Sequence, residues 1–199
     1  MVFKIPRWPF DKFASADRSL GTQMKATGEV MAIGRNMEEA LLKAVRSLEI
    51  DAIGLDDITF DELSDEDLLQ SLMPARDDRL FMIADLLRRG VTIEAIHDKT
   101  LIDEFFLDKV LHIIEIERDL AHNIGDLDQL AYAKKNGFAD ATIANIWHKT
   151  TAEVRQLRTQ ASILPVYKMV DTVAAEFESQ TPYYYATYAV SYTHLTLPT

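Results

Sequence analysis

His112 and Glu115 stand three residues apart, a spacing that places two side chains on one face of a helix. Two such side chains can supply two ligands to a metal ion. A two-metal site in a helical bundle needs a second pair of this kind, and the sequence has none. The remaining histidines also lack a partner at ligand spacing: His97, His122, His148 and His194. The favoured interpretation is a solvated helix face, so no metal site is predicted.

Carboxylates are concentrated between residues 50 and 75, where lysine and arginine are absent. The acidic residues of this segment are Asp51, Asp56, Asp57, Asp61, Glu62, Asp65, Glu66 and Asp67. They lack the spacing, central glycine and terminal glutamate of a calcium-binding loop. A solvated linker with a short helix at 65–72 is therefore favoured over a divalent-cation site.

Glu29 lies beside an apolar run, residues 30–33, that is flanked by Gly28 and Gly34. This pattern predicts a short buried strand. A carboxylate in a buried strand is costly unless it is paired or faces a polar cavity. Two interpretations stay open: an ion pair with Arg35 or Arg46, or a functional carboxylate.

Residues 139–160 predict two short helices that could form a DNA-binding helix-turn-helix. Lys149, Arg155 and Arg158 could contact phosphate. The net charge of -11 and the acidic Glu153 in the second helix oppose this reading. A plain helical hairpin is favoured, and nucleic acid is not an expected partner.

Recognisable catalytic motifs are missing from the sequence. It has no cysteine, and it contains no Walker-type loop, nucleophile elbow or zinc-protease signature. We therefore predict no catalytic, metal-binding or cofactor-binding residues in this chain.

Apolar periodicity and capping residues predict a mainly α protein. Asn36 with Glu39 begins the first helix, and further helices are expected after Asp78, from Thr92 to His97, and over 101–121, 126–136, 139–146 and 151–161. The apolar positions expected to face inward from 101–121 are Phe105, Leu107, Val110, Leu111, Ile114 and Leu120. Residues 2–5 resemble a strand without a preceding partner, which suggests a truncated chain. The predicted fold class is a helical bundle preceded by a small α+β part.

The composition of the sequence indicates a cellular location and disfavours some classes of partner. The 199 residues include no signal peptide and no apolar run long enough to span a bilayer. Excess negative charge disfavours anionic membranes as well as nucleic acids. The cytoplasm is the expected location.

Two groups of motifs carry a family resemblance. Residues 4–13, KIPRWPFDKF, and 21–35, GTQMKATGEVMAIGR, closely resemble the end of the carboxyphosphate-forming ATP-grasp half of the large subunit of carbamoyl-phosphate synthase. GFADA from Gly137, residues 153–158 and residues 165–177 resemble the close of its helical oligomerisation domain and the lead into its second ATP-grasp half. The resemblance implies an ATP-grasp remnant at 1–54, an all-α oligomerisation domain at 55–188, and a foreign-looking tail at 189–199.

The resemblance also implies a function for the complete enzyme. That enzyme is a glutamine-hydrolysing ligase, which makes carbamoyl phosphate from bicarbonate, glutamine-derived ammonia and two molecules of ATP for arginine and pyrimidine biosynthesis. Its ATP and its Mg²⁺ or Mn²⁺ are expected to bind outside this chain, which alone should be inactive. Expected partners are the remaining large-subunit domains, the small glutamine amidotransferase subunit and a second copy of the helical domain.

By the same resemblance, Met24 and Glu29 line an internal tunnel that carries carbamate. The alternative hypothesis is a free-standing helical interaction module that uses the hairpin at 139–160.

Overall fold

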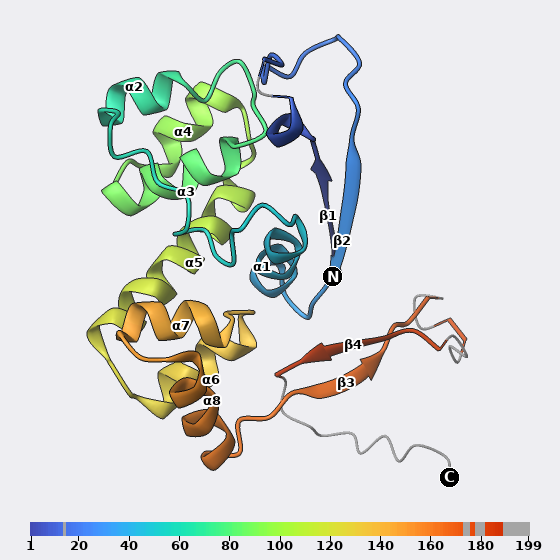
Figure 1. Cartoon of the computed structure of the whole chain (residues 1–199), viewed down its shortest axis with the longest axis vertical. Helices are drawn as coiled ribbons and strands as arrows, with labels where there is room; N and C mark the ends of the chain where they lie inside the picture. The colour runs from blue at the N-terminus through green and yellow to red at the C-terminus, as the bar shows by residue number, and fades with distance from the viewer. Residues whose placement is uncertain (14, 173–175, 178–181, 189–199) are drawn as a thin grey trace.

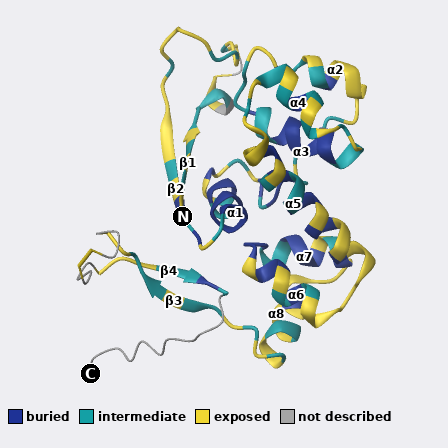
Figure 2. Ribbon diagram, turned by 180° about the vertical axis from the view of Figure 1, so that it is seen from behind, coloured by how far each residue is buried: buried dark blue, intermediate teal, exposed yellow. Residues whose placement is uncertain are grey.

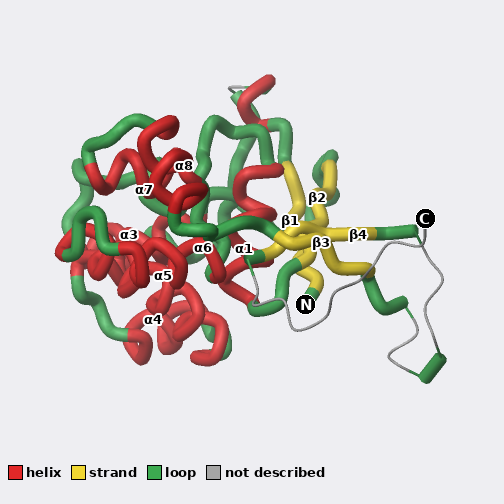
Figure 3. The backbone as a smooth tube through the Cα atoms, turned by 90° about the horizontal axis from the view of Figure 1, so that it is seen from below, coloured by secondary structure: helices red, strands yellow, loops and turns green. Residues whose placement is uncertain are grey.

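The computed structural model describes residues 1–13, 15–172, 176–177 and 182–188. The tail at 189–199, predicted to be foreign, lies outside the described residues. Helices are the main regular structure of the described chain and take up a little under half of it, and the strands lie together on one side of them (Figure 3). The protein is therefore mainly α, as the sequence predicts.

The N-terminal strand has a partner, contrary to expectation. Strand β1, Val2–Arg7, pairs antiparallel with β2, Gly28–Ile33, and a short 3-10 helix, η1, Phe10–Lys12, follows β1. Alternate residues of β1 face inward, and helix α1, Met37–Ser47, packs against both strands. Figure 1 shows α1 between this strand pair and the long central helix.

Helix α1 begins where the sequence predicts. The Asn36 side chain accepts a hydrogen bond from the Glu39 backbone N–H at 2.8 Å. The Glu39 carboxylate accepts from the Arg35 backbone N–H at 2.7 Å, one residue before the usual capping-box donor. The first bond satisfies one of the N–H groups that lack an intrahelical partner at the start of the helix, and the second holds the residue before the cap.

The remaining helices also follow the predicted order. They are α2 Asp65–Gln70, α3 Arg79–Arg89, α4 Ile93–Thr100, α5 Glu104–His122, α6 Leu127–Lys135, α7 Asp140–Trp147 and α8 Thr151–Gln160. Thr92, Asp126 and Thr150 each cap a helix through the side-chain oxygen. Gly90 ends α3 in the left-handed conformation at φ 95°.

Helix α5 is the centre of the core. It packs against α1, α3, α4, α6 and α7, and Leu107, Val110, Ile114 and Leu120 are buried as predicted. Phe105 was predicted to face inward, and this was wrong: its exposed fraction is 51%. Phe105 lies two residues before Leu107 in the first turn of α5, a spacing that places it on the opposite side of the helix from Leu107. Figure 2 shows burial concentrated on α1, α3 and the middle of α5.

The acidic segment at 50–75 is more than a solvated linker. Leu55, Leu68 and Leu72 are fully buried in the main core, while most of the acids remain exposed. The short helix predicted here is α2. The segment therefore covers the helical core with its leucines.

The chain beyond α8 departs from the all-α expectation for 55–188. Strands β3, Val166–Met169, and β4, Tyr184–Thr187, pair antiparallel. Lys43 of α1 donates a 2.6 Å hydrogen bond to the Ala186 carbonyl oxygen, which fixes β4 to the helical part. The sequence signal was weak here, because each strand has only four residues.

Candidate functional site

Glu29 lies on the exposed side of the β1–β2 pair. Its Oε1 accepts a hydrogen bond from Lys4 Nζ at 2.9 Å, and both side chains are more than half exposed. The expectation of a buried strand at this position was wrong, as was pairing with Arg35 or Arg46. Arg46 instead donates to the Gly137 carbonyl oxygen at 2.8 Å.

Met24 lies in the segment before β2, with an exposed fraction of 95%. Neither Met24 nor Glu29 is enclosed by the described part of this chain. A passage wall that includes them requires further protein on this side.

His112 belongs to a hydrogen-bonded group that spans three helices. Its Nδ1 lies 2.7 Å from Glu38 Oε1, and its Nε2 lies 2.9 Å from the Tyr132 hydroxyl oxygen. Glu115 is exposed and takes no part. His112 therefore joins α1, α5 and α6 rather than pairing with Glu115 as a metal ligand.

The acids of 50–75 are used locally or point to solvent. Asp57 Oδ2 accepts from the backbone N–H groups of Ile53 and Gly54 at 2.7 and 2.8 Å. Asp65 lies 3.3 Å from Arg89. In the part of the chain that the structure describes, no three His, Cys, Asp or Glu side chains converge as metal ligands.

The hairpin at 139–160 commits two of its charged residues to folding. Glu153 completes a capping box with Thr150, and Arg158 Nε donates to Asp140 Oδ2 at 2.8 Å. Lys149 and Arg155 remain exposed. These uses fit the plain helical hairpin that the sequence favoured.

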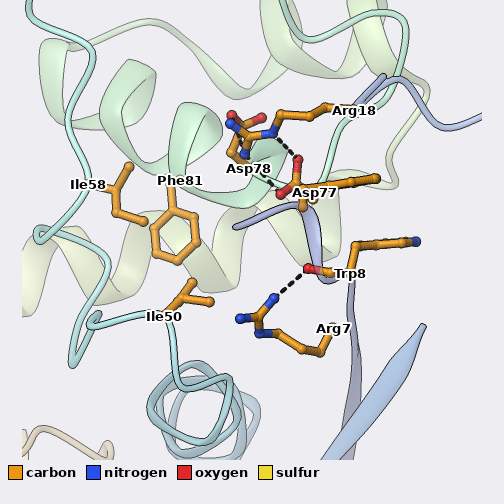
Figure 4. Close-up of a pocket in the computed structure, with 9 residues that line it drawn as sticks. Arg7, Trp8, Arg18, Ile50, Ile58, Asp77, Asp78 and Phe81 are labelled. Atoms are coloured by element: carbon orange, nitrogen blue, oxygen red, sulfur yellow. Dashed lines mark hydrogen bonds and ion pairs between the residues drawn. The ribbon is translucent and has the colours of Figure 1, made fainter. Parts of the chain in front are cut away.

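A cavity of about 360 Å³ lies between β1, the 50–58 segment and the start of α3 (Figure 4). Ile50, Ile58 and Phe81 form its apolar wall. Arg18 lies at one edge of the cavity, next to Asp77, to which it donates hydrogen bonds of 2.8 and 2.9 Å. The Arg18–Asp77 pair attaches the N-terminal segment to the residues just before α3. Each of the two charged groups therefore has a partner of opposite charge.

Arg7, on the opposite side of this cavity, is also engaged. Its guanidinium donates to the carbonyl oxygens of Leu48 and Trp8. Both arginines of the cavity therefore already have acceptors within the protein. The cavity is for this reason a poor fit for a polyphosphate.

A second hollow, of about 290 Å³, is almost wholly apolar and lies between β1 and the helices α1, α3 and α5. Ile5, Ile83 and Phe106 are among its lining residues. Phe105 and Phe106 pack edge to face with ring centroids 5.4 Å apart, and both are about half exposed. We call this hollow and the Phe105–Phe106 pair the apolar groove. Such exposed apolar surface is typical of a contact site between proteins.

Two buried ionic groups were missed from the sequence. Lys134 Nζ donates to the Phe138 carbonyl oxygen and to Asp140 Oδ1, each at 2.7 Å. Burial lowers the pKa of Lys134, opposed by Asp140. Glu117, the centre of the second group, follows Ile113 by four residues, so its place on the apolar stripe of α5 was a usable signal.

The fold and the groove together define a helical contact domain that carries small strand pairs. Residues 29–162 match the family described as the carbamoyl-phosphate synthetase large chain, oligomerisation domain. This range covers most of the chain, and the protein belongs to this family. The matched range begins in β2 and so includes α1, which the sequence grouped with residues 1–54. None of the described helices is long and apolar enough to cross a membrane.

Proposed function

We propose that this chain is a contact segment of a glutamine-hydrolysing carbamoyl-phosphate synthase, and that its helical domain joins two copies of the large chain. The family match supports the enzyme, and the apolar groove is the observation that carries the contact role. The strand pairs β1–β2 and β3–β4 would contact the remaining large-subunit domains. The small glutamine amidotransferase subunit would bind elsewhere in the complete enzyme, which we place in the cytoplasm.

The chemistry would take place outside this chain. The complete ligase would make carbamoyl phosphate from bicarbonate, ammonia and ATP, for arginine and pyrimidine biosynthesis. The engagement of Arg7 and Arg18 by protein acceptors supports the binding of ATP and Mg²⁺ or Mn²⁺ elsewhere in the complete enzyme. We expect the purified chain neither to bind MgATP in calorimetry nor to hydrolyse it. Tight binding or turnover would contradict the proposal.

Self-association tests the groove directly. In sedimentation velocity at micromolar concentrations, we expect the chain to form dimers and the Phe106→Glu variant to remain monomeric. A charge at this position would have to be desolvated in the interface. The matched control is Ile124→Glu, because Ile124 is 56% exposed just beyond the opposite end of α5. A monomeric wild-type chain would refute self-association, and dimeric Phe106→Glu would refute the groove.

Met24 and Glu29 are proposed to line the carbamate passage. Their exposure on the same chain segment before and within β2 supports this, because a passage wall needs accessible side chains. In the complete enzyme, Glu29→Ala should lower carbamoyl phosphate formed per ATP hydrolysed. Glu62→Ala, at an exposed acid elsewhere, is the control. Unchanged product yield in Glu29→Ala would remove the assignment while leaving the contact role intact.

A further inference from the structure

A polar cluster is buried where the 50–58 segment meets α3 and α7. Within the described residues, the buried side-chain atoms that lack a protein hydrogen-bond partner are Asp56 Oδ1, Arg88 Nη1 and Thr142 Oγ1. A Cβ placed on Gly54 would collide with Asp56 Oδ1 and lie 3.3 Å from Thr142 Cγ2, so these two side chains are neighbours. Because buried polar atoms are nearly always paired, this concentration of exceptions indicates a function.

Glu117 of α5 joins this cluster through Arg88. The side chain of Glu117 is almost fully buried, and its Oε2 accepts from Arg88 Nη2 at 2.9 Å and from Nε at 3.3 Å. The charge of Arg88 also acts on Asp56, and Arg88 Nη1 lies 3.9 Å from Asp85 Oδ1. A single guanidinium therefore interacts electrostatically with three carboxyl groups.

The other nearby cations do not remove this imbalance. Arg89 Nη2 donates to Asp85 Oδ2 at 2.8 Å, so Arg89 balances the charge of Asp85. The charges of Glu117 and Asp56 are then balanced mainly by Arg88. Arg118, beside Glu117 on α5, donates to the carbonyl oxygens of Leu87 and Arg88 at 3.2 and 3.0 Å. Its charge favours ionised Glu117 only weakly compared with burial.

Burial raises the pKa of Glu117 to about 7, and the charge of Asp56 adds to this against the opposing effect of Arg88. Burial also raises the pKa of Asp56. The folded protein therefore keeps a proton on Glu117 between its ordinary pKa of 4.5 and about 7. An acid whose pKa is raised by folding loses its contribution to stability as the pH rises through that window.

Asp56 belongs to a short loop, residues 52–57, that is held together by hydrogen bonds between its own residues. The Asp57 carboxylate accepts from the N–H groups of Ile53 and Gly54, and Ala52 and Leu55 are buried beneath. The loop reaches the helices through Asp56 and Leu55. Its attachment therefore depends on the charges around Asp56 as well as on the burial of Leu55.

We propose that Asp56, Arg88, Glu117 and Thr142 form a proton-operated latch that holds the 52–57 loop against α3, α5 and α7. With a proton on Glu117, the attraction between the charges of Asp56 and Arg88 is not opposed by a charge on Glu117, and the loop stays closed. When Glu117 releases that proton to water, two buried carboxylates compete for one guanidinium. Movement of Asp56 into solvent relieves the repulsion and opens the loop.

Amide hydrogen exchange of the full chain tests the latch. Protection of the Ile53 and Gly54 N–H groups, corrected for the intrinsic pH dependence of exchange, should fall about tenfold between pH 6 and pH 8. This factor follows if the carboxyl of Glu117 regains its ordinary pKa in the open state. Unchanged protection across this range in the wild-type chain would overturn the proposal.

Two variants distinguish opening of the 52–57 loop from a general loss of stability. Glu117→Gln keeps the neutral shape and should hold both amides protected at pH 8, whereas Glu115→Gln, at an exposed position on the same helix, should behave like the wild type. If Glu117→Gln shows the wild-type tenfold fall, the latch is wrong.

Asp56→Asn provides a test that does not depend on the folding of Glu117→Gln. Because Asp56 raises the pKa of Glu117, its neutral replacement should move the NMR titration midpoint of the Glu117 carboxyl to lower pH. An unmoved midpoint would also overturn the proposal.

Discussion

At the scale of single residues, some buried charges of this domain have more than one hydrogen-bond partner. Lys134 illustrates the arrangement, because its exposed fraction is only 5% and its ammonium group has both a carbonyl and a carboxylate partner. Asp140 in turn accepts from Arg158, and the pKa of Asp140 is lowered because these bonds outweigh its burial. The Tyr188 ring lies 4.8 Å from the Lys134 ammonium. One lysine thus connects α6, α7 and the chain just after β4.

Lys134→Met should lower the free energy of unfolding by about 2–3 kcal/mol, since it leaves Phe138 O without this donor and weakens the pairing of Asp140. Arg158 retains one bond to Asp140, which keeps the loss below that of a fully broken buried pair. Lys135→Met is the control, because Lys135 is exposed and its loss should cost no more than about 0.5 kcal/mol. Urea unfolding monitored by circular dichroism measures both, and equal losses would contradict the pairing argument.

At the scale of elements, helix boundaries were readable because they depend on local chemistry. Asn36, Thr92 and Asp126 cap helices through bonds to residues three positions later. Gly90 likewise ends its helix without help from distant residues. Such signals lie within one turn of the boundary, so a single sequence contains them.

Other features depend on distant residues, and here the sequence was insufficient. The partner of β1 begins about twenty residues downstream, and the apolar run at 30–33 gave no indication that Glu29 and Met31 face solvent. Phe105 lies two residues before Leu107, so on a helix it points away from the stripe of Leu107 and Ile114, which the apolar character of the residue alone does not reveal. The partners of His112 come from α1 and α6, which no spacing within α5 can reveal.

Gly137 shows how one element constrains another. Its φ is 93°, and an added Cβ would lie 2.7 Å from Glu39 Cα in α1. Gly90 has a similar φ of 95° but open space around it. Gly137→Ala should therefore cost the strain of a left-handed alanine, about 1 kcal/mol, plus displacement of α1, for a total of about 3 kcal/mol.

Gly90→Ala isolates the strain and should cost only about 1 kcal/mol. Thermal and urea unfolding of the two variants compare them directly. Equal destabilisation would show that α1 and the end of α6 are not in the close contact described.

At the scale of the whole molecule, the chain combines an apolar groove with a net charge of -11. Figure 3 shows the strand pairs gathered on one side of the helices, so contacts with other protein can form on either side. Excess negative charge opposes both compactness and the approach of a second copy. Ion pairs between exposed groups, such as Lys4 and Glu29, offset little of this, because such pairs contribute at most about 1 kcal/mol.

Salt should therefore stabilise the chain. Raising NaCl from about 20 to about 200 mM shortens the screening length to below 10 Å, and the midpoint of thermal unfolding should rise by a few degrees. Dimers should form at lower protein concentration under the same change. Glu66→Lys makes the net charge less negative and should reduce the salt response, whereas Lys135→Glu should increase it; both positions are exposed. A midpoint that falls with salt would mean that favourable ion pairs outweigh the net repulsion.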